Sequence, residues 1–292
     1  MNSQAPHDRT GELLGGRYRL VERLDGGGQG VVYRADDLRD GDQVAVKILH
    51  LLNAHDPEWR ARMLREAHAL TVLTGSAAVR VYDQTWTHDG AFCIVMELLR
   101  GRDFEDHLRA REAAGEPLSL ADLRALLEPV VDTLERAHAQ GILHRDLKPG
   151  NVYVTESGGV RLLDFGLAKF LRMPSFTRAG IVAGSPSYIA PEIWSGTTEL
   201  DQRIDVYSLG ALAFRALAGR PPFAADSLKQ IFELVTSGER PSLRDVRPDL
   251  SEAADAWMQQ MLAIRREHRF ARVRAAWNAL SHVDSGAASS RR

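Results

Sequence analysis

The sequence predicts an α+β protein of two lobes, in which a smaller, strand-rich lobe with one helix is followed by a larger, mostly helical lobe. Three observations favour this fold class. The chain has 292 residues, which is enough for about two packed lobes. Short apolar segments separated by glycine turns fill the first third of the chain. From Ser119 onward, long apolar stripes at helical spacing dominate.

The composition is ordinary for a globular protein, with 44% hydrophobic and 26% charged residues. A formal net charge of −2 gives no electrostatic reason to expect nucleic-acid binding. No stretch approaches the ~18 apolar residues of a membrane span, and the N-terminus lacks a basic-then-apolar signal pattern. The single cysteine, Cys93, lies in an apolar run and suits a small core residue. We therefore expect a cytoplasmic protein with no membrane span in this chain.

A glycine-rich hairpin is predicted near the N-terminus. Strand-forming residues from Tyr18 lead through Leu24 and Asp25 into a run of glycines, and a second strand begins at Val31. The glycines are Gly26, Gly27, Gly28 and Gly30. Glycines let backbone N–H groups approach phosphates without an intervening side chain. An ordinary hairpin turn explains the same residues about equally well.

A lysine and a glutamate are predicted to form a pair in the first lobe. Residues 43–49 form an apolar strand that Lys47 interrupts, and lysine is seldom buried without a partner. Helical spacing from Pro57 to Leu73 places Glu66 on the apolar face, where a carboxylate requires compensation. Lys47 is the obvious candidate. The alternatives are a lysine that reaches solvent at a strand end and a glutamate at the wet edge of the helix.

The second lobe begins after a further strand, residues 92–98, and a glycine turn. Ser119 has the sequence of a helix N-cap, with Asp122 three residues later. The apolar stripe that follows continues to Ala137 and predicts a core helix, which leads through Gly141 to residues 144–151.

Residues 144–151, HRDLKPGN, bring together groups that suit phosphoryl transfer. Asp146 can accept a proton from a hydroxyl, Lys148 can hold a phosphoryl group, and Asn151 offers a carbonyl oxygen to a hard divalent cation. Two predicted strands, 152–154 and 160–163, then lead to Asp164-Phe165-Gly166. A solvated surface loop is the alternative, and it accounts poorly for eight such residues in this order.

In this order, these segments resemble the glycine-rich loop, the VAIK lysine, the HRD catalytic loop and the DFG turn of the eukaryotic-like (Hanks-type) Ser/Thr protein kinases. The resemblance extends from about Tyr18 to Leu280, and we expect a bacterial member. It implies a bilobal kinase fold, with ATP held between a small antiparallel β-sheet N-lobe with one helix and a larger, mostly α-helical C-lobe. The implied segments are a flexible N-terminus at 1–16, the N-lobe at 17–97, a hinge at 98–101, the C-lobe at 102–282 and a disordered tail at 283–292.

The resemblance implies transfer of the γ-phosphoryl group of ATP to Ser/Thr hydroxyls of proteins. It makes Asp146 the catalytic base, with Lys148 steadying the phosphoryl group and Lys47 on the α/β-phosphates beside Glu66. Mg²⁺, or alternatively Mn²⁺, would be held by Asn151 and Asp164. The implied nucleotide-binding positions are Leu24, Gly26, Gly27, Gly28, Gly30, Val32, Ala45, Lys47, Met96, Glu97, Leu99, Asn151 and Asp164.

Regulation is also implied by the resemblance. Thr177 is the favoured phosphate acceptor of an activation segment at 170–183, Ser175 is the second choice, and Arg145 would pair with the phosphate. The alternative is that both hydroxyls are ordinary loop groups. We expect Ser/Thr-bearing protein substrates, and a homodimer as a route to autophosphorylation in trans.

Structural roles follow for Asp205, which would hold the catalytic-loop backbone, and for Glu192, which would pair with a late arginine, Arg269. Asp25 stands where the family has its first loop glycine, so we expect weaker ATP binding or altered loop motion. That departure keeps open a pseudokinase that acts as a binding module. A small-molecule phosphotransferase of related fold is the other alternative, and the long activation segment argues against it.

Overall fold

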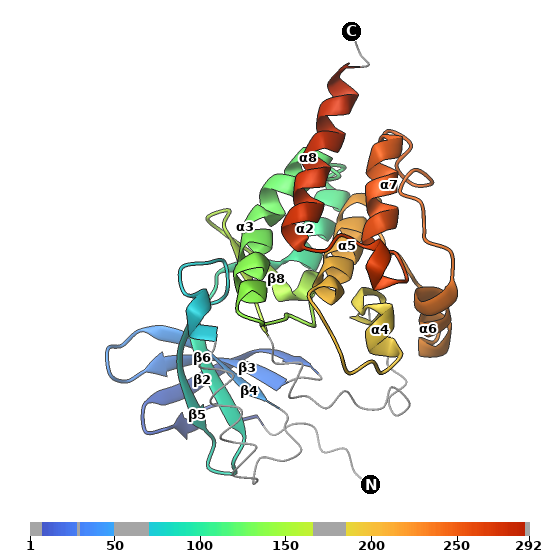
Figure 1. Cartoon of the computed structure of the whole chain (residues 1–292). Coiled ribbons are helices and arrows are strands. Elements are labelled where there is room, and N and C mark those ends of the chain that lie inside the picture. The colour runs from blue at the N-terminus through green and yellow to red at the C-terminus, as the bar shows by residue number, and fades with distance from the viewer. Residues whose placement is uncertain (1–7, 28–29, 50–69, 166–184, 290–292) are drawn as a thin grey trace. The chain divides into compact units, whose positions relative to one another are not determined.

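The computed structural model describes residues 8–27, 30–49, 70–165 and 185–289 (Figure 1). By its contacts the chain divides into two compact units. The N-terminal unit comprises Met1–Thr74 and Val79–Arg100, and the C-terminal unit comprises Gly75–Ala78 and Gly101–Arg292. The main division therefore falls between Arg100 and Gly101, within the stretch 98–101 that the sequence predicts as a hinge.

The described part of the N-terminal unit is built on a six-stranded antiparallel sheet with the strand order β1-β2-β3-β4-β6-β5. The strands are β1 (Leu13–Leu14), β2 (Tyr18–Gly27), β3 (Gly30–Asp37), β4 (Gln43–Leu49), β5 (Val81–Trp86) and β6 (Phe92–Glu97). A 3₁₀ turn spans Leu70–Leu73, the last residues of the helix predicted over 57–73. The rest of that helix lies outside the described residues.

The two faces of this sheet differ in composition. Alternate residues point to opposite faces of a strand, and directly paired residues share a face. One face carries an apolar cluster to which β3 contributes Val31, Tyr33 and Ala35, and β4 contributes Val44, Val46 and Ile48. Cys93 and Val95 of β6 complete it from the other side of β4. The buried Cys93 confirms the prediction of a core cysteine.

The sequence predicts a flexible N-terminus over 1–16, but residues 8–16 pack against the sheet, and Leu13–Leu14 form strand β1. Gly15 (φ +55°) and Gly16 (φ +68°) reverse the chain, so that Leu14 pairs with Tyr18 and is buried to 1% exposure. Arg9 adds ion pairs to Glu12 and Asp89. The apolar Leu14 side chain and this arginine hold the segment against the sheet.

The C-terminal unit is mostly helical where it is described (Figure 1). Its helices are α2 (Phe104–Ala113), α3 (Leu120–Ala139), α4 (Pro191–Trp194), α5 (Arg203–Ala218), α6 (Leu228–Ser237), α7 (Glu252–Met261) and α8 (Val273–Ser289). A small antiparallel sheet has the order β7-β8-β9, formed by Gly101–Asp103, Val152–Thr155 and Val160–Leu162. Further 3₁₀ turns span Pro149–Asn151, Ser185–Tyr188 and Arg266–His268.

Helix α5 is the centre of this unit, because residues Ile204–Leu217 are all buried. It contacts α3, α7 and α8, which surround it in Figure 1. Such a helix is apolar nearly all round, as the sequence predicts. The prediction of a core helix capped by Ser119 is also confirmed, since α3 begins with a reciprocal capping box of Ser119 and Asp122.

The C-terminal end also differs from the prediction. Helix α8 runs to Ser289, into the stretch 283–292 for which the sequence predicts a disordered tail. Small and polar residues do not end a helix by themselves when no proline intervenes, and none follows Val273. No described helix combines the length and the apolar run that crossing a membrane would require. The predicted fold class, an antiparallel sheet unit and a mostly helical unit, is confirmed.

Candidate active site

A loop between α3 and β8 carries the polar groups at 144–151. Helix α3 ends at Ala139, and Gly141 turns the chain with φ +72°. The loop continues to a 3₁₀ turn over Pro149–Asn151, which delivers it into β8. Because α3 and β8 pack in the core of the C-terminal unit, both ends of this loop are fixed.

The carboxylate of Asp205 on α5 holds the backbone at the start of this loop. It accepts hydrogen bonds from the N–H groups of His144 (2.8 Å) and Arg145 (2.9 Å), and from His138 Nε2 (2.7 Å). Burial alone would raise the pKa of Asp205, but the hydrogen bond from His138 and the neighbouring positive charge lower it below its usual value. Asp205 therefore stays ionised, and the prediction that it supports the loop backbone is confirmed.

This support matters because Arg145 adopts φ +68°, a left-handed conformation that is unfavourable for a residue with a side chain. A residue in this region persists when its surroundings determine it. The two bonds to Asp205 hold the N–H of this residue and that of the residue before it, directly upstream of Asp146.

Asp146, Lys148 and Asn151 form one cluster. Lys148 Nζ lies 2.8 Å from Asp146 Oδ2. The side-chain amide of Asn151 donates to the same oxygen at 3.0 Å and to the backbone carbonyl of Asp146 at 2.7 Å. Asn151 is buried, whereas the Asp146 and Lys148 side chains keep 17% and 22% exposure. A fixed carboxylate beside a cation thus remains open to a reactant.

The segment Leu163–Phe165 is tied to this cluster. The Leu163 N–H donates to the Asn151 carbonyl at 2.8 Å, and His144 Nε2 lies 3.0 Å from the Leu163 carbonyl. The His144 ring also packs on Phe165, with ring centroids 4.7 Å apart. Burial lowers the pKa of His144, so the imidazole is neutral and donates through Nε2. Asp164, with φ +58°, is thereby set next to the loop.

Asn151 and Asp164 provide a donor set that fits a divalent cation bound together with phosphates. The Asn151 amide donates through Nδ2, so its side-chain carbonyl oxygen is the atom that would act as a ligand. Small hard cations such as Mg²⁺ are commonly bound by one or two protein oxygens plus substrate phosphates and water. The described ranges contain no group of three or more His, Cys, Asp or Glu side chains placed to hold a metal ion.

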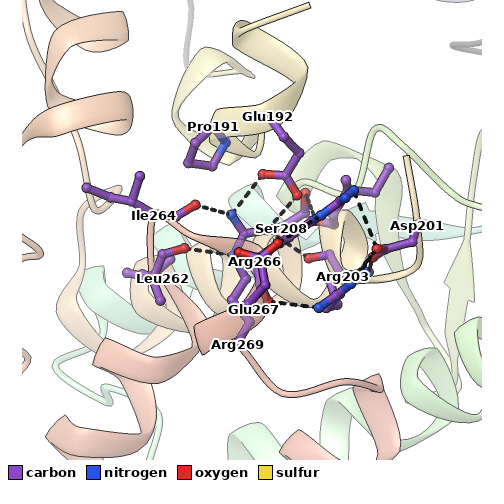
Figure 2. A network of polar contacts seen from close by, with 12 residues as sticks. Pro191, Glu192, Asp201, Arg203, Ser208, Leu262, Ile264, Arg266, Glu267 and Arg269 are labelled. Carbon is purple, nitrogen blue, oxygen red and sulfur yellow. Dashed lines mark hydrogen bonds and ion pairs between the residues drawn. The ribbon is translucent and has the colours of Figure 1, made fainter. Parts of the chain in front are cut away.

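Glu192 and Arg269 form the buried ion pair that the sequence predicts (Figure 2). The two terminal guanidinium nitrogens of Arg269, Nη1 and Nη2, each lie 2.8 Å from an oxygen of the Glu192 carboxylate. Arg269 also donates to the carbonyls of Ala263, Ile264 and Arg203, and its guanidinium stacks 5.0 Å from the centre of the Tyr207 ring. This network anchors helix α4 to the core of the C-terminal unit.

In the N-terminal unit, four of the predicted nucleotide-binding residues share one face of the sheet. Val32 pairs directly with Lys47, and Ala45 pairs with Met96, so all four point away from the apolar cluster. Lys47 is 7% exposed on β4, between β3 and β6. This face of the sheet therefore carries a buried lysine among the small and apolar side chains of Val32, Ala45 and Met96.

The remaining predicted positions have mixed surroundings. Leu24 is 47% exposed on β2, and Glu97 and Leu99 are half-buried at and after the end of β6. A Cβ atom on Gly30 would lie 2.3 Å from the Ile48 carbonyl oxygen, so this position has room only for glycine. Gly26 and Gly27 end β2. The predicted residues that lie outside the described ranges are Gly28, Glu66, Ser175 and Thr177.

Two residues with supporting roles are missing from the sequence-based prediction. His138, which donates to Asp205, carries no local motif, and its partner is 67 residues away. The second residue is Arg203. Its backbone carbonyl accepts a hydrogen bond from Arg269, and its guanidinium donates to Asp201. Its supporting role is likewise visible only in the folded structure. Helical spacing does place His138 on the same face of α3 as Leu134, which is the only sequence signal that could have identified it.

Comparisons with known proteins agree with this geometry. Residues 18–282 match the family described as protein kinase domain. Serine/threonine-protein kinase Pkn1 of Myxococcus xanthus is 37% identical over 273 residues, which cover 91% of this chain and 38% of that protein. PknA of Mycobacterium tuberculosis is 36% identical over 262 residues, which cover 88% of this chain and 60% of that protein.

A crystal structure of the PknI kinase domain of Mycobacterium tuberculosis superposes with a TM-score of 0.72 at 30% identity. The match covers 94% of this chain and 98% of that one. The chain thus spans a whole solved kinase domain but only 38% to 60% of the two curated relatives. Together with the cluster of Asp146, Lys148 and Asn151, these matches show that the chain belongs to the protein kinase domain family, and that its relatives include serine/threonine-protein kinases of bacteria.

Proposed function

We propose that this domain transfers the γ-phosphoryl group of Mg-ATP to Ser/Thr hydroxyls of protein substrates. The observation that carries the proposal is the Asp146 cluster, in which one carboxylate oxygen accepts from Lys148 at 2.8 Å and from Asn151 at 3.0 Å. The relatives named as serine/threonine-protein kinases support the same class of acceptor.

In the proposed mechanism, the hydroxyl oxygen of the substrate bonds to the γ-phosphorus while the bond from that phosphorus to the β,γ-bridging oxygen breaks. ADP leaves with the bridging oxygen, and Asp146 orients the hydroxyl and accepts its proton. Lys148, beside Asp146, offers a positive charge to the transferring group. Little covalent chemistry is left to the protein, so positioning and charge stabilisation supply most of the rate enhancement.

Asn151 and Asp164 would hold the divalent cation, for which we propose Mg²⁺, with Mn²⁺ as a substitute. When bound, such a cation neutralises charge that develops on the phosphate oxygens. The chain itself fixes the separation between Asn151 and Asp164. The backbone N–H of Leu163, the residue before Asp164, donates to the backbone carbonyl of Asn151.

For nucleotide binding we propose Lys47 as the contact of the α/β-phosphates and Glu66 as its ion-pair partner. Val32, Ala45 and Met96 share the face of Lys47 and would line the base and sugar. The other proposed contacts are Leu24, Gly26, Gly27, Gly28, Gly30, Glu97 and Leu99.

We further propose autophosphorylation on Thr177, with Ser175 as the second site, by one copy acting on another in a homodimer. A negatively charged phosphate there would pair with Arg145. Because the reaction consumes ATP, we place it in the cytoplasm.

The test is the intact mass of the protein before and after incubation with Mg-ATP and a generic basic protein substrate. Wild type should add phosphate to itself or to the substrate, and Asp146→Asn should be slower by about 10²–10⁴-fold, the usual contribution of a general base. Asp226→Asn, an exposed aspartate of the same unit, is the matched control and should match wild type.

Activity of Asp146→Asn within about tenfold of wild type would show that the base assignment is wrong. Nucleotide binding with no transfer by wild type would instead support a pseudokinase. Peptide mapping then locates the phosphate, and a fully active enzyme that is unmodified at Thr177 and Ser175 would refute the activation-segment proposal.

A further inference from the structure

The glycine-rich hairpin between β2 and β3 carries a carboxylate near the end of its first strand. Asp25 is exposed, and its Oδ1 accepts the N–H of the next residue, Gly26, at 2.7 Å. Backbone N–H groups of such a glycine turn are the groups that bind phosphate oxygens. Gly26 itself lies in β2 and pairs with Val31, so the Asp25 carboxylate stands in the strand that leads into the turn.

The register of the sheet places Asp25 on the same face as Lys47. Asp25 pairs with Val32, and Val32 pairs with Lys47, so the three residues form one cross-strand row. Two strand spacings separate the Cα atoms of Asp25 and Lys47 by about 10 Å. That distance is shorter than a nucleotide triphosphate, so a nucleotide that contacts Lys47 lies within electrostatic range of Asp25.

The basic residue packed on the hairpin stands on the other face. Arg23 pairs with Tyr33, a member of the apolar cluster, and its guanidinium lies over Gly26, where a Cβ atom would come 2.0 Å from Nη2. Arg23 therefore packs on the face of the sheet opposite to Lys47. Its side chain does not lie between Asp25 and Lys47.

We propose that Asp25 is an affinity-determining residue, whose negative charge repels the nucleotide phosphates and raises the KM for ATP. This inference rests on the proposed function in one respect, namely that Lys47 contacts the phosphates of ATP. Because like charges repel in proportion to their product, the penalty grows with the number of phosphates on the nucleotide.

The test uses the whole chain and three ligands that differ only in phosphate number: adenosine, ADP and ATP, with Mg²⁺ present. Dissociation constants are measured by calorimetry for wild type, Asp25→Asn and Asp25→Gly. Asp25→Asn removes the charge but keeps a carbonyl oxygen, whereas Asp25→Gly removes both. At near-surface dielectric screening we expect ATP affinity to rise about 3- to 10-fold in either variant. The gain for ADP should be smaller, and adenosine binding should stay unchanged.

Asp40→Asn is the matched control. Asp40 is also exposed, and its Oδ1 also accepts a backbone N–H, that of Asp42 at 3.2 Å. It lies in the turn between β3 and β4, at the far end of β3 from Gly30. The control should bind all three ligands as wild type does. In steady-state assays the Asp25 variants should lower the KM for ATP and leave kcat unchanged, and added salt should reduce the difference.

Equal changes for all three ligands, or weaker adenosine binding, would overturn the proposal and indicate that the carboxylate contacts the ribose. Unchanged ATP binding in both Asp25 variants would overturn it as well. The binding series needs no turnover, so a graded gain without phosphoryl transfer would sustain the role of Asp25 and refute only the proposed function. If neither wild type nor the variants bind ATP, both the role of Asp25 and the proposed function are refuted.

Discussion

Replacing Arg269 with alanine should be among the most destabilising single changes in the C-terminal unit. The Arg269 side chain has 0% exposure, and its fork bonds both oxygens of Glu192 at 2.8 Å (Figure 2). Removing one partner of a buried ion pair leaves the other charge uncompensated, which costs about 3–5 kcal/mol. The carbonyls of Ala263 and Ile264 also lose their donor. We therefore expect a loss of about 4 kcal/mol in the free energy of unfolding.

The assay is urea unfolding followed by tryptophan fluorescence, since the paired rings of Trp257 and Trp277 report on this unit. With a slope of about 3 kcal/mol per molar urea for a chain of this size, the midpoint should fall by about 1.3 M. Arg269→Lys keeps the charge but cannot form the two-pronged contact, so it should fall between wild type and Arg269→Ala.

Arg265→Ala is the control for a neighbouring arginine. The Arg265 side chain is 72% exposed, and it lies 3.8 Å from Glu267, a surface pair that contributes about 0–1 kcal/mol. If Arg269→Ala shifted the midpoint no further than Arg265→Ala does, the claim that the buried network anchors helix α4 would be refuted.

Two further predictions concern the support of the catalytic loop. The Asp205 carboxylate accepts three hydrogen bonds, and the amide of Asp205→Asn must turn an N–H donor toward at least one of these donors. We therefore expect kcat to fall while nucleotide affinity stays unchanged. Urea unfolding should show a stability lower by about 2–4 kcal/mol. Unchanged kcat in a folded variant would contradict this. Burial lowers the pKa of His144, so below about pH 7 the unfolded chain binds a proton that the native protein does not. The free energy of unfolding should therefore decrease as pH falls, and His144 contributes up to about 1.4 kcal/mol per pH unit to this decrease. When urea unfolding is repeated across a pH series, the free energy of unfolding of His144→Gln should depend less on pH than that of wild type.

The sequence predicts well those features whose signals are local. The motif around Asp146, the hairpin that leads to Asp164 and the helix capped by Ser119 are each encoded within a few residues, and the structure shows the same elements. Periodicity also predicts the buried α5, because an apolar surface on all sides leaves it no exposed face.

Features that depend on distant partners could not be predicted in this way. Arg215 of α5 is buried and pairs with Glu105 and Glu112 of α2, which are 110 and 103 residues away. On sequence alone, that arginine interrupts an apolar pattern with no indication of its partners. The docking of Leu14 beside Tyr18 depends on two glycine conformations in the intervening turn, and a polar, glycine-containing terminus gives the same pattern whether it packs or not.

The supports of the catalytic loop show how these two kinds of feature combine. The φ of +68° at Arg145 is unfavourable by about 1–3 kcal/mol. The bonds from its N–H and that of His144 to Asp205 offset this, but they require an ionised carboxylate with 0% exposure. Burying that charge is unfavourable in turn, and the His138 hydrogen bond compensates part of it. His138 and Asp205 lie on α3 and α5, two helices that the sequence predicts with strong signals. The least regular part of the chain, which carries Asp146, is thus positioned by two of its most regular elements, so that even conservative changes at His138 or Asp205 should act on catalysis.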